Sequence, residues 1–380
     1  MKVAIAIDSF KGSMSSYEAG RAVSEGIRAA DVSAETVICP LADGGEGTVA
    51  AVVSAMGGEL CTVRVSGPLG EPVDATYGVI PKTRTAIVEM SAAAGITLIT
   101  PAQRNPLFTT TYGVGELIAH AIRENGCRHF LIGIGGSATN DGGVGMLQAL
   151  GFSFLDAEGR EIPRGARGLQ KLARIECNGA MEALSACSFS VACDVTNPLC
   201  GARGCSAVYG PQKGATPEMI REMDASLARY AAWSAALSGR DWADTPGAGA
   251  AGGMGFAFLS YLGGTLESGV SLVMRVTELE KQILDADLVV TGEGRLDGQS
   301  CMGKAPIGVA TLAKKHGKPV IAFSGCVGED AALCNDHGID AFFPILRTVC
   351  TLEDAMETKN AYRNLRDTAE QVFRLICCFR

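Results

Sequence analysis

The chain has 380 residues and a formal net charge of −8, with 47% hydrophobic and 19% charged residues. This length suits two domains or one large one, and the apolar content supports a large core. An acidic chain with no long basic block is not expected to bind nucleic acid. No apolar run reaches the ~18 residues of a membrane-spanning helix, so we expect no membrane partner.

The N-terminus and the cysteines indicate a cytoplasmic protein. The apolar run after Lys2 ends at Asp8 and is too short for a signal peptide. The fourteen cysteines are scattered and follow no metal-binding spacing, so we expect reduced thiols and no zinc site. The 48 glycines follow no repeat, which assigns them to turns and close backbone approaches.

The first 150 residues alternate apolar strands, polar loops and helices, which is typical of a parallel α/β sheet. The predicted strands are 2–7, 37–40, 85–90 and 130–134, and the predicted helices run from Ser15 or Ser16 to Ala30, from 49 to 56, from 114 to 125 and from 144 to 150. Residues 62–80 alternate β-branched residues with proline breaks, which indicates an antiparallel ribbon.

The same alternation returns near the end of the chain. The predicted strands are 189–193, 288–291, 319–323 and 341–345, and the predicted helices begin at Thr216, after the glycine-rich loop 247–255, and over 307–316 and 353–376. We therefore expect a two-lobed α/β protein. Residues 1–66 plus 282–380 would form a discontinuous Rossmann- or flavodoxin-like lobe with a parallel sheet. Residues 67–281 would form an inserted, mixed α/β lobe, with the active site in the cleft between the two.

A glycine-rich loop separates the predicted strand 130–134 from the helix 144–150. Such a loop can bind phosphate, because its amides point inward and the helix dipole favours an anion. Asp141 lies where an anion would bind, which indicates a bound cation; the alternative is a helix N-cap. The candidate phosphate-binding residues are Gly135, Gly136, Ser137, Thr139, Asn140, Gly142 and Gly143.

Four other polar loops follow predicted strands. They contain Asp8 with Lys11, Asp43 with Glu46, Asp194 with Asn197, and Glu293 with Arg295 and Asp297. In parallel α/β sheets, ligands bind at the carboxyl ends of the strands. Several acids and bases converging there fit Mg²⁺ held by carboxylates, with lysine and arginine on phosphates.

Two named motifs match only in part. Gly133-x-Gly135-x-x-Ala138 fits a loose dinucleotide fingerprint, but the helix of a true fingerprint begins at the second glycine, and here Ser137 to Gly143 intervene. Gly298 to Lys304 has Walker A spacing, but Ala305 replaces the residue that holds magnesium, so Lys304 alone remains a candidate phosphate ligand. The alternative function is a nucleotide- or dinucleotide-binding α/β protein, either an NAD-dependent enzyme or a non-catalytic nucleotide sensor.

Eight blocks, in this order, resemble the type 1 glycerate kinase family over nearly the whole chain. They are Asp8–Ser13, Pro40–Thr48, Gly67–Gly70, Thr109–Gly115, Gly135–Gly143, Cys193–Leu199, Gly210–Gly214 and Gly292–Asp297. The resemblance implies a two-domain α/β enzyme that transfers the γ-phosphoryl group of ATP to D-glycerate with Mg²⁺. The product would be phosphoglycerate, with the 2-phosphate favoured over the 3-phosphate. A monomer and a homodimer both remain open.

Roles for single residues follow from their chemistry once this reaction is assumed. ATP phosphates would bind the loop 135–143 together with Lys213 and Lys304. The candidates for catalysis are Asp194 or Asp297 on the attacking hydroxyl, with Lys11 and Arg295 balancing charge. The candidates for binding D-glycerate are Asp8, Ser9, Lys11, Asp43, Glu46 and Arg295. The candidates for holding Mg²⁺ are Asp141, Asp194 and Glu293, and which acid is the base stays open.

Overall fold

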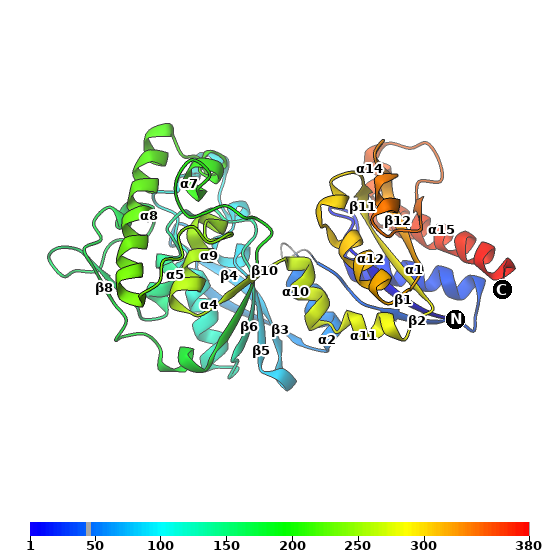
Figure 1. Cartoon of the computed structure of the whole chain (residues 1–380), viewed down its shortest axis with the longest axis horizontal. Helices are drawn as coiled ribbons and strands as arrows, with labels where there is room; N and C mark the ends of the chain where they lie inside the picture. Colours follow the sequence, from blue (N-terminus) through cyan, green and yellow to red (C-terminus); the bar gives the residue numbers. More distant parts are fainter. Residues whose placement is uncertain (43–46, 380) are drawn as a thin grey trace. The chain divides into compact units, whose positions relative to one another are not determined.

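The computed structural model describes residues 1–42 and 47–379 (Figure 1). Asp43 and Glu46, two of the predicted substrate-binding residues, lie outside the described residues. The chain forms two compact units. Unit 1 comprises Met1–Asp43, Ala50–Gly57 and Val270–Arg380, and unit 2 comprises Gly44–Val49 and Gly58–Gly269. In the described residues, none of the helices has both the length and the apolar character for crossing a membrane.

Unit 1 is built on a five-stranded sheet with the order β13-β12-β11-β1-β2, and all its strands are parallel. The strands are β1 (Lys2–Ile7), β2 (Glu35–Ile38), β11 (Leu288–Leu296), β12 (Val320–Val327) and β13 (Ala341–Pro344). The predicted α/β fold with a parallel sheet in the first lobe is confirmed. Because β1 and β11 are neighbours in the middle of the sheet, their carboxyl ends meet.

Helices cover both faces of this sheet (Figure 1). The helices on one face are α1 (Ser16–Ala30) and α15 (Thr358–Cys378), and those on the other are α10 (Gly269–Val276), α11 (Leu279–Leu284) and α12 (Ala305–Lys315). A capping box starts α1: Glu18 N donates to Ser15 Oγ (3.2 Å) and Ser15 N donates to Glu18 Oε2 (2.9 Å). Gly26 lets α15 approach closely, because a Cβ there would collide with Arg366 O. The remaining helices of this unit are α2 (Thr48–Met56), α13 (Leu333–Asp336) and α14 (Leu352–Met356).

Unit 2 contains a mixed six-stranded sheet with the order β10-β9-β6-β5-β4-β3. The strands are β3 (Glu59–Ser66), β4 (Pro72–Ile80), β5 (Thr85–Glu89), β6 (His129–Gly133), β9 (Ser188–Ala192) and β10 (Thr265–Glu267). The ribbon predicted over 62–80 is confirmed as the antiparallel pair of β3 and β4. This pairing places β3 in unit 2, whereas the sequence-based boundary assigned its residues to the first lobe. A separate antiparallel pair joins β7 (Ser153–Leu155) to β8 (Arg174–Glu176).

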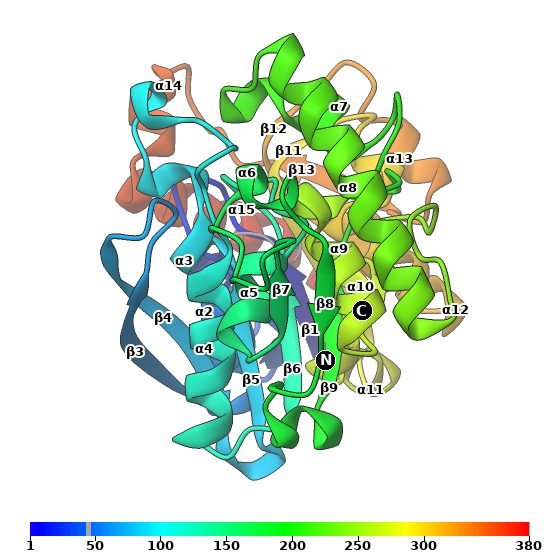
Figure 2. The ribbon, with the colours of Figure 1, turned by 90° about the vertical axis from the view of Figure 1, so that its left-hand side faces the viewer.

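Helices α4 and α9 pack against the sheet of unit 2, and α8 packs against α9 and β8 (Figures 1 and 2). The α-helices of this unit are α3 (Ser91–Ala94), α4 (Tyr112–Arg123), α5 (Val144–Ala149), α6 (Ala166–Leu169), α7 (Cys205–Tyr209), α8 (Pro217–Ser238) and α9 (Ala250–Tyr261). Tyr230 of α8 is fully buried and packs edge-to-face on Phe154 and Phe256, with centroid distances of 6.0 and 5.2 Å. These contacts join α8, α9 and β7 into one core.

Three elements differ from the sequence-based prediction. Strand β11 extends to Leu296, beyond the predicted residues 288–291, because its later residues continue to pair with β12. Glu293 and Arg295 therefore lie on a strand and not in a loop. The terminal helix predicted over 353–376 is two helices, α14 and α15, since the extended backbone of Glu357 (φ −58°, ψ 123°) separates them. Helix α9 contains a left-handed segment over 251–253.

Candidate active site

The loop after β1 is held in shape by its own backbone. Asp8 N donates to Gly292 O (2.9 Å), which ties the end of β1 to β11. Phe10 and Met14 exchange two backbone hydrogen bonds of 2.9 and 3.0 Å, and both side chains are buried. Lys11 lies between these two residues and is exposed. The loop therefore presents a lysine from a fixed turn, next to the carboxylate of Asp8.

Asp8 and Glu293 form a buried acidic pair at the ends of β1 and β11. Their exposed fractions are 8% and 7%. Burial raises the pKa of Glu293, and the charges of Asp8 and Asp297 raise it further, while a hydrogen bond from Ser300 Oγ and the charge of Lys304 oppose the shift. Buried carboxylates that repel each other attract a cation. These surroundings suit the predicted role of Glu293 as a metal ligand.

The N-terminus of α12 faces the same region. Lys304 is the N-cap residue of this eleven-residue helix, and Ala305 at its first position lines the same cavity as Glu293. Lys304 Nζ lies 4.0 Å from Glu293 Oε2, and its side chain is 45% exposed. The segment before it forms a short 3₁₀ helix, Ser300–Met302, and not a loop that wraps a phosphate. The positive end of the helix dipole and a lysine together suit an anion.

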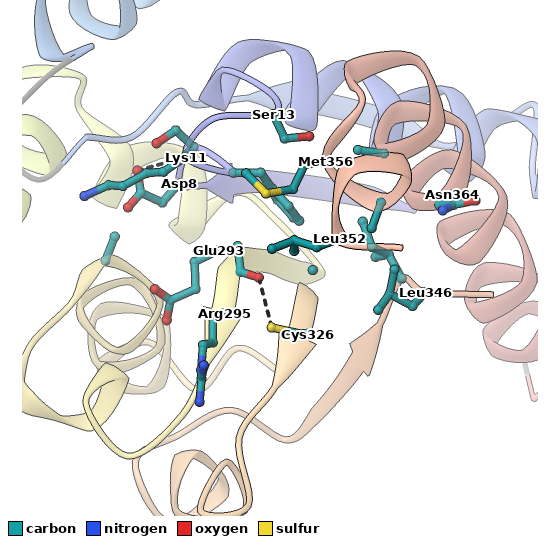
Figure 3. A pocket seen from close by; sticks show the side chains of 18 of the residues that line it. Asp8, Lys11, Ser13, Glu293, Arg295, Cys326, Leu346, Leu352, Met356 and Asn364 are labelled. Carbon is teal, nitrogen blue, oxygen red and sulfur yellow. Dashed lines mark hydrogen bonds between the residues drawn. The ribbon is translucent and has the colours of Figure 1, made fainter. Parts of the chain in front are cut away.

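These groups line one end of a cavity in unit 1 with a volume of about 440 Å³. The polar lining residues are Asp8, Ser9, Lys11, Ser13, Glu293, Arg295, Lys304 and Asn364, and the larger apolar ones are Phe10, Ile345, Leu346, Leu352 and Met356. Figure 3 shows Asp8, Lys11 and Glu293 together at one end, with Leu352 and Met356 beside them and Leu346 farther along. The sequence reasoning missed these apolar residues: Phe10 follows β1, Ile345 and Leu346 follow β13, and Leu352 and Met356 lie on α14.

Arg295 and Asp297 interact with each other beside this cavity. Arg295 and Asp297 form an ion pair, with Nε 3.1 Å from Oδ2, and Figure 3 shows the Arg295 side chain pointing away from Asp8. Asp297 Oδ1 accepts a hydrogen bond from Gln299 N (3.0 Å). Among the described residues, Asp297 is not part of the cavity lining. Asp297 thus orders the turn before α12, which weakens its candidacy as the base.

The glycine-rich loop of unit 2 is more enclosed than the sequence indicated. Within the fully described stretch 135–143, Gly135 and Gly136 are exposed and the other seven residues are buried. Gly142 N donates to Gly252 O (2.9 Å), and Gly143 N donates to Asp141 Oδ1 (3.2 Å). The left-handed segment 251–253 packs so closely that a Cβ on Gly252 would collide with Thr139 O. The amides of Gly142 and Gly143 are therefore already used, and the predicted open phosphate cradle is not the observed arrangement.

Both oxygens of the Asp141 carboxylate accept hydrogen bonds from its own unit. Asp141 Oδ2 accepts from Thr111 N and Thr111 Oγ1, each at 2.9 Å, and from Gly145 N at 3.3 Å. Burial raises its pKa, and these hydrogen bonds oppose the shift. Because donors surround both oxygens, the geometry favours the helix-cap alternative over the predicted metal ligand. The carboxylate joins the start of α4 to the start of α5.

Lys213 and the polar residues of the loop also bind one another. Lys213 Nζ donates to Ser137 Oγ (2.7 Å) and to Thr139 O (2.6 Å). The side chain is buried, and burial lowers its pKa to about 8 against the opposing charges of Cys205 and Asp141. Asn140 Nδ2 donates to Ser206 Oγ (2.8 Å). Lys213 therefore supports the loop from inside, whereas the sequence placed it on a phosphate.

Asp194 follows β9 and is exposed, and its Oδ1 accepts from Gly269 N (3.1 Å). Asn197 beyond it is structural, since its side chain bonds Arg203 O (2.8 Å) and Tyr209 OH (2.7 Å).

The dinucleotide fingerprint is not formed. In the described stretch between β6 and α5, the helix begins at Val144 and not at the second glycine of the motif.

The geometry defines a class of protein: an α/β protein that brings carboxylates, lysines and a helix N-terminus together at the carboxyl ends of parallel strands. The sequence model of the glycerate kinase family matches residues 3–377. The chain therefore belongs to the glycerate kinase family, as its sequence blocks predicted, and it is an enzyme of the phosphotransferase class.

Individual relatives cover nearly the whole chain. It is 47% identical over 376 residues to a glycerate kinase of Haemophilus influenzae, which spans 99% of both chains. It is 48% identical over 365 residues to a glycerate 2-kinase of Escherichia coli, with 96% of this chain and 95% of the relative covered. The fold is similar to the crystal structure of a putative glycerate kinase 2 from Salmonella typhimurium LT2. That comparison has a TM-score of 0.92 and 50% identity, and it covers 100% and 99% of the two chains.

Proposed function

We propose that the enzyme transfers the γ-phosphoryl group of ATP to D-glycerate, with Mg²⁺, and forms 2-phosphoglycerate. The observation that carries the proposal is the meeting of Asp8 and Glu293 with Lys11 and Lys304 in one cavity. The substrate is supported by the family and by relatives named glycerate kinase. The 2-position is supported by the relative named glycerate 2-kinase.

Asp8 and Glu293 suit Mg²⁺ in number and kind. Proteins usually hold this ion by one or two carboxylates, and substrate phosphates and water complete the shell. Within the described residues, no group of three or more potential ligand residues (histidine, cysteine or acid) forms a cage, so two acids and the nucleotide would share the ion. Ser9 N donates to Asp8 Oδ1 (2.7 Å), which orients that carboxylate. When bound, the ion would neutralise charge on the phosphates.

Lys11 and Lys304 would handle the anionic groups of the two substrates. The transferring phosphoryl group carries negative charge over its oxygens, and a lysine beside it lowers the barrier by electrostatic stabilisation. Lys304 lies at the N-terminus of α12, where the helix dipole adds to its charge. Lys11 lies on the fixed turn after β1, and we propose that it and Arg295 bind the glycerate carboxylate.

We propose Asp194 as the group that accepts the hydroxyl proton. Asp194 is exposed and its Oδ1 accepts from Gly269 N, whereas the other predicted base, Asp297, lies outside the cavity lining among the described residues and orders the turn before α12. The predicted location of the active site between the two lobes stays a prediction. A cytoplasmic location and the choice between monomer and homodimer also stay predictions.

The test is phosphoryl transfer from Mg-ATP to a panel of small hydroxy acids, with ³¹P NMR to identify the product. We expect turnover with D-glycerate and a resonance of 2-phosphoglycerate, and we expect chelation of the metal to stop the reaction. Absence of turnover with D-glycerate would contradict the proposal. Formation of 3-phosphoglycerate would contradict the position only. NAD binding in place of ATP would restore the dinucleotide alternative.

A further inference from the structure

The cavity of unit 1 is larger and more apolar than D-glycerate requires. Its volume is about 440 Å³, and only one end carries the charged groups. D-glycerate is a small polar acid with almost no apolar surface to bury. Apolar walls with a few polar groups are typical of sites that bury a larger, partly apolar ligand.

The apolar end consists of side chains that are partly open to solvent. Leu352 is 76% exposed, Leu346 is 44% exposed and Met356 is 38% exposed, and all three line this cavity. They come from the segment after β13 and from α14 (Figure 3). Exposed apolar side chains that gather in one hollow mark a binding surface, because a ligand that covers them removes apolar area from water.

The cavity has a fixed floor. Phe10 is 4% exposed and Ile345 is 3% exposed, and both belong to the core under α1 and α15. Thr358 Oγ1 donates to Ser13 O (2.7 Å), which anchors the start of α15 to the loop after β1. Met356 lies close to Gly12, because a Cβ at that glycine would be 3.0 Å from Met356 Cε. Helix α14 and the loop after β1 are therefore neighbours. The apolar end therefore adjoins the charged end within one fixed structure.

We propose that the apolar end of this cavity binds the adenine base of the nucleotide donor. The phosphates would extend toward Lys304 and the N-terminus of α12, beside Lys11. A purine is flat and apolar on both faces, and a nucleotide joins it to a charged chain, so a nucleotide matches both ends of the cavity. The inference rests on the proposed function in that ATP is taken as the donor.

Two further observations favour this position. Asn364 of α15 also lines the cavity, and its amide offers both a donor and an acceptor, as the N1–N6 edge of adenine requires (Figure 3). The glycine-rich loop of unit 2 is a weaker nucleotide site, because the amides of Gly142 and Gly143 bind partners within the protein. The base site is thus assigned to unit 1.

The test compares two ligands that share phosphates and differ in the base. Calorimetry on the full chain would measure ADP and inorganic tripolyphosphate, with the double variant Leu352→Ser/Met356→Ser beside the unchanged enzyme. We expect ADP to bind about tenfold more weakly to the variant, while tripolyphosphate affinity changes by less than about twofold. Leu346→Ser, measured alone, should weaken ADP by about threefold.

The matched control is Leu333→Ser/Leu375→Ser. These two leucines are 48% and 57% exposed and, among the described residues, lie outside the cavity lining. ADP affinity should not change in this control. The assignment is overturned if ADP binds the Leu352/Met356 variant as it binds the unchanged enzyme. Equal weakening of ADP and tripolyphosphate also overturns it, since the apolar end would then not distinguish the base.

Failure of this inference and failure of the proposed function give different results. If the unchanged enzyme does not phosphorylate D-glycerate but its ADP affinity depends on Leu352 and Met356, the reaction is wrong and the base site stands. If the enzyme phosphorylates D-glycerate but neither the Leu352/Met356 variant nor the Leu346 variant changes the affinity for ADP, the reaction stands and the base binds elsewhere. A rise in the KM for D-glycerate alone would assign the apolar end to the acceptor and overturn the inference.

Discussion

Lys304 Nζ lies 4.0 Å from Glu293 Oε2, at the point where α12 begins and β11 passes beside it. The pair joins a group suited to phosphate with a group suited to a cation. Burial raises the pKa of Glu293, and Lys304 works against that shift. Lys304 thus favours the charged form of Glu293 before any substrate binds, and the two residues can be tested separately.

Replacing Glu293 with glutamine should lower kcat by about 10²- to 10³-fold, because the carboxylate would no longer bind the metal. The Mg²⁺ concentration that gives half-maximal rate should rise. Because the pKa of Glu293 is raised in the folded state, its ionisation lowers the stability of the protein as pH rises. Removing this charge should therefore not lower the melting temperature at pH 7. Glu278→Gln, an exposed acid on the same unit, is the control. A normal Mg²⁺ dependence in the Glu293 variant would remove Glu293 as a ligand.

The Lys304→Met variant should shift the acidic side of the pH–rate profile upward. Lys304 lowers the pKa of Glu293, so its removal raises that pKa, and Glu293 becomes protonated at a higher pH. The measurement is kcat/KM against pH at saturating Mg²⁺, with Lys281→Met, an exposed lysine of α11, as the control. We also expect the KM for ATP to rise about tenfold. An unmoved acidic limb would show that Glu293 does not control it.

Asp141→Asn should act on stability. The amide would present its NH₂ to donors such as Thr111 N, so we expect a loss of about 2–4 kcal/mol in unfolding free energy. Chemical denaturation measures this loss. In the folded fraction, the Mg²⁺ dependence of the rate should stay normal. A stable variant with weakened Mg²⁺ activation would instead restore Asp141 as a metal ligand.

Asp194→Asn should reduce kcat far more than it raises the KM for ATP, by about 10²-fold or more, if Asp194 accepts the hydroxyl proton. Steady-state kinetics with both substrates varied will separate the two parameters. Asp74→Asn is a suitable control, because that side chain is 67% exposed on β4. A kcat close to normal would exclude Asp194 as the base.

Lys213 should make the free energy of unfolding depend on pH in the alkaline range. Its pKa is about 8 in the folded protein, below its ordinary value of 10.5, so the unfolded chain binds more protons between these two values. The unfolding free energy contributed by this group therefore rises as pH increases from about 8 to about 10.5. Denaturation at several pH values, compared with Lys213→Met, isolates this contribution. A difference between the two proteins that is independent of pH would contradict the buried, shifted lysine.

The parallel sheet of unit 1 was predictable because its signals are local. Each apolar run is followed by a polar turn, and Ser15 with Glu18 marks the start of α1. The length of β11 was not predictable, since its polar residues 292–295 resemble a loop and only pairing with β12 makes them a strand. Local signals identified the elements, while partners distant in the chain decided where some of them end.

The candidate site, too, was predictable only in part. Asp8, Lys11 and Glu293 were predicted from polar residues after apolar runs, and the structure places all three around one cavity. The enclosure of the glycine-rich loop was not predictable, because the segment that closes it lies more than a hundred residues later, around Gly252. Part of the apolar wall was missed because Met356 lies within the predicted helix 353–376, which the structure breaks at Glu357.

The pairing of β1 with β11 has a consequence for biosynthesis. β1 ends at Ile7 and β11 begins at Leu288, and the residues between them include the whole of unit 2. On the ribosome, unit 2 can complete its core while β1 still lacks its central partner. The cavity, which needs both Asp8 and Asn364, forms only when nearly all of the chain has emerged. Incomplete chains are therefore expected to contain a folded unit 2 and no phosphotransferase activity.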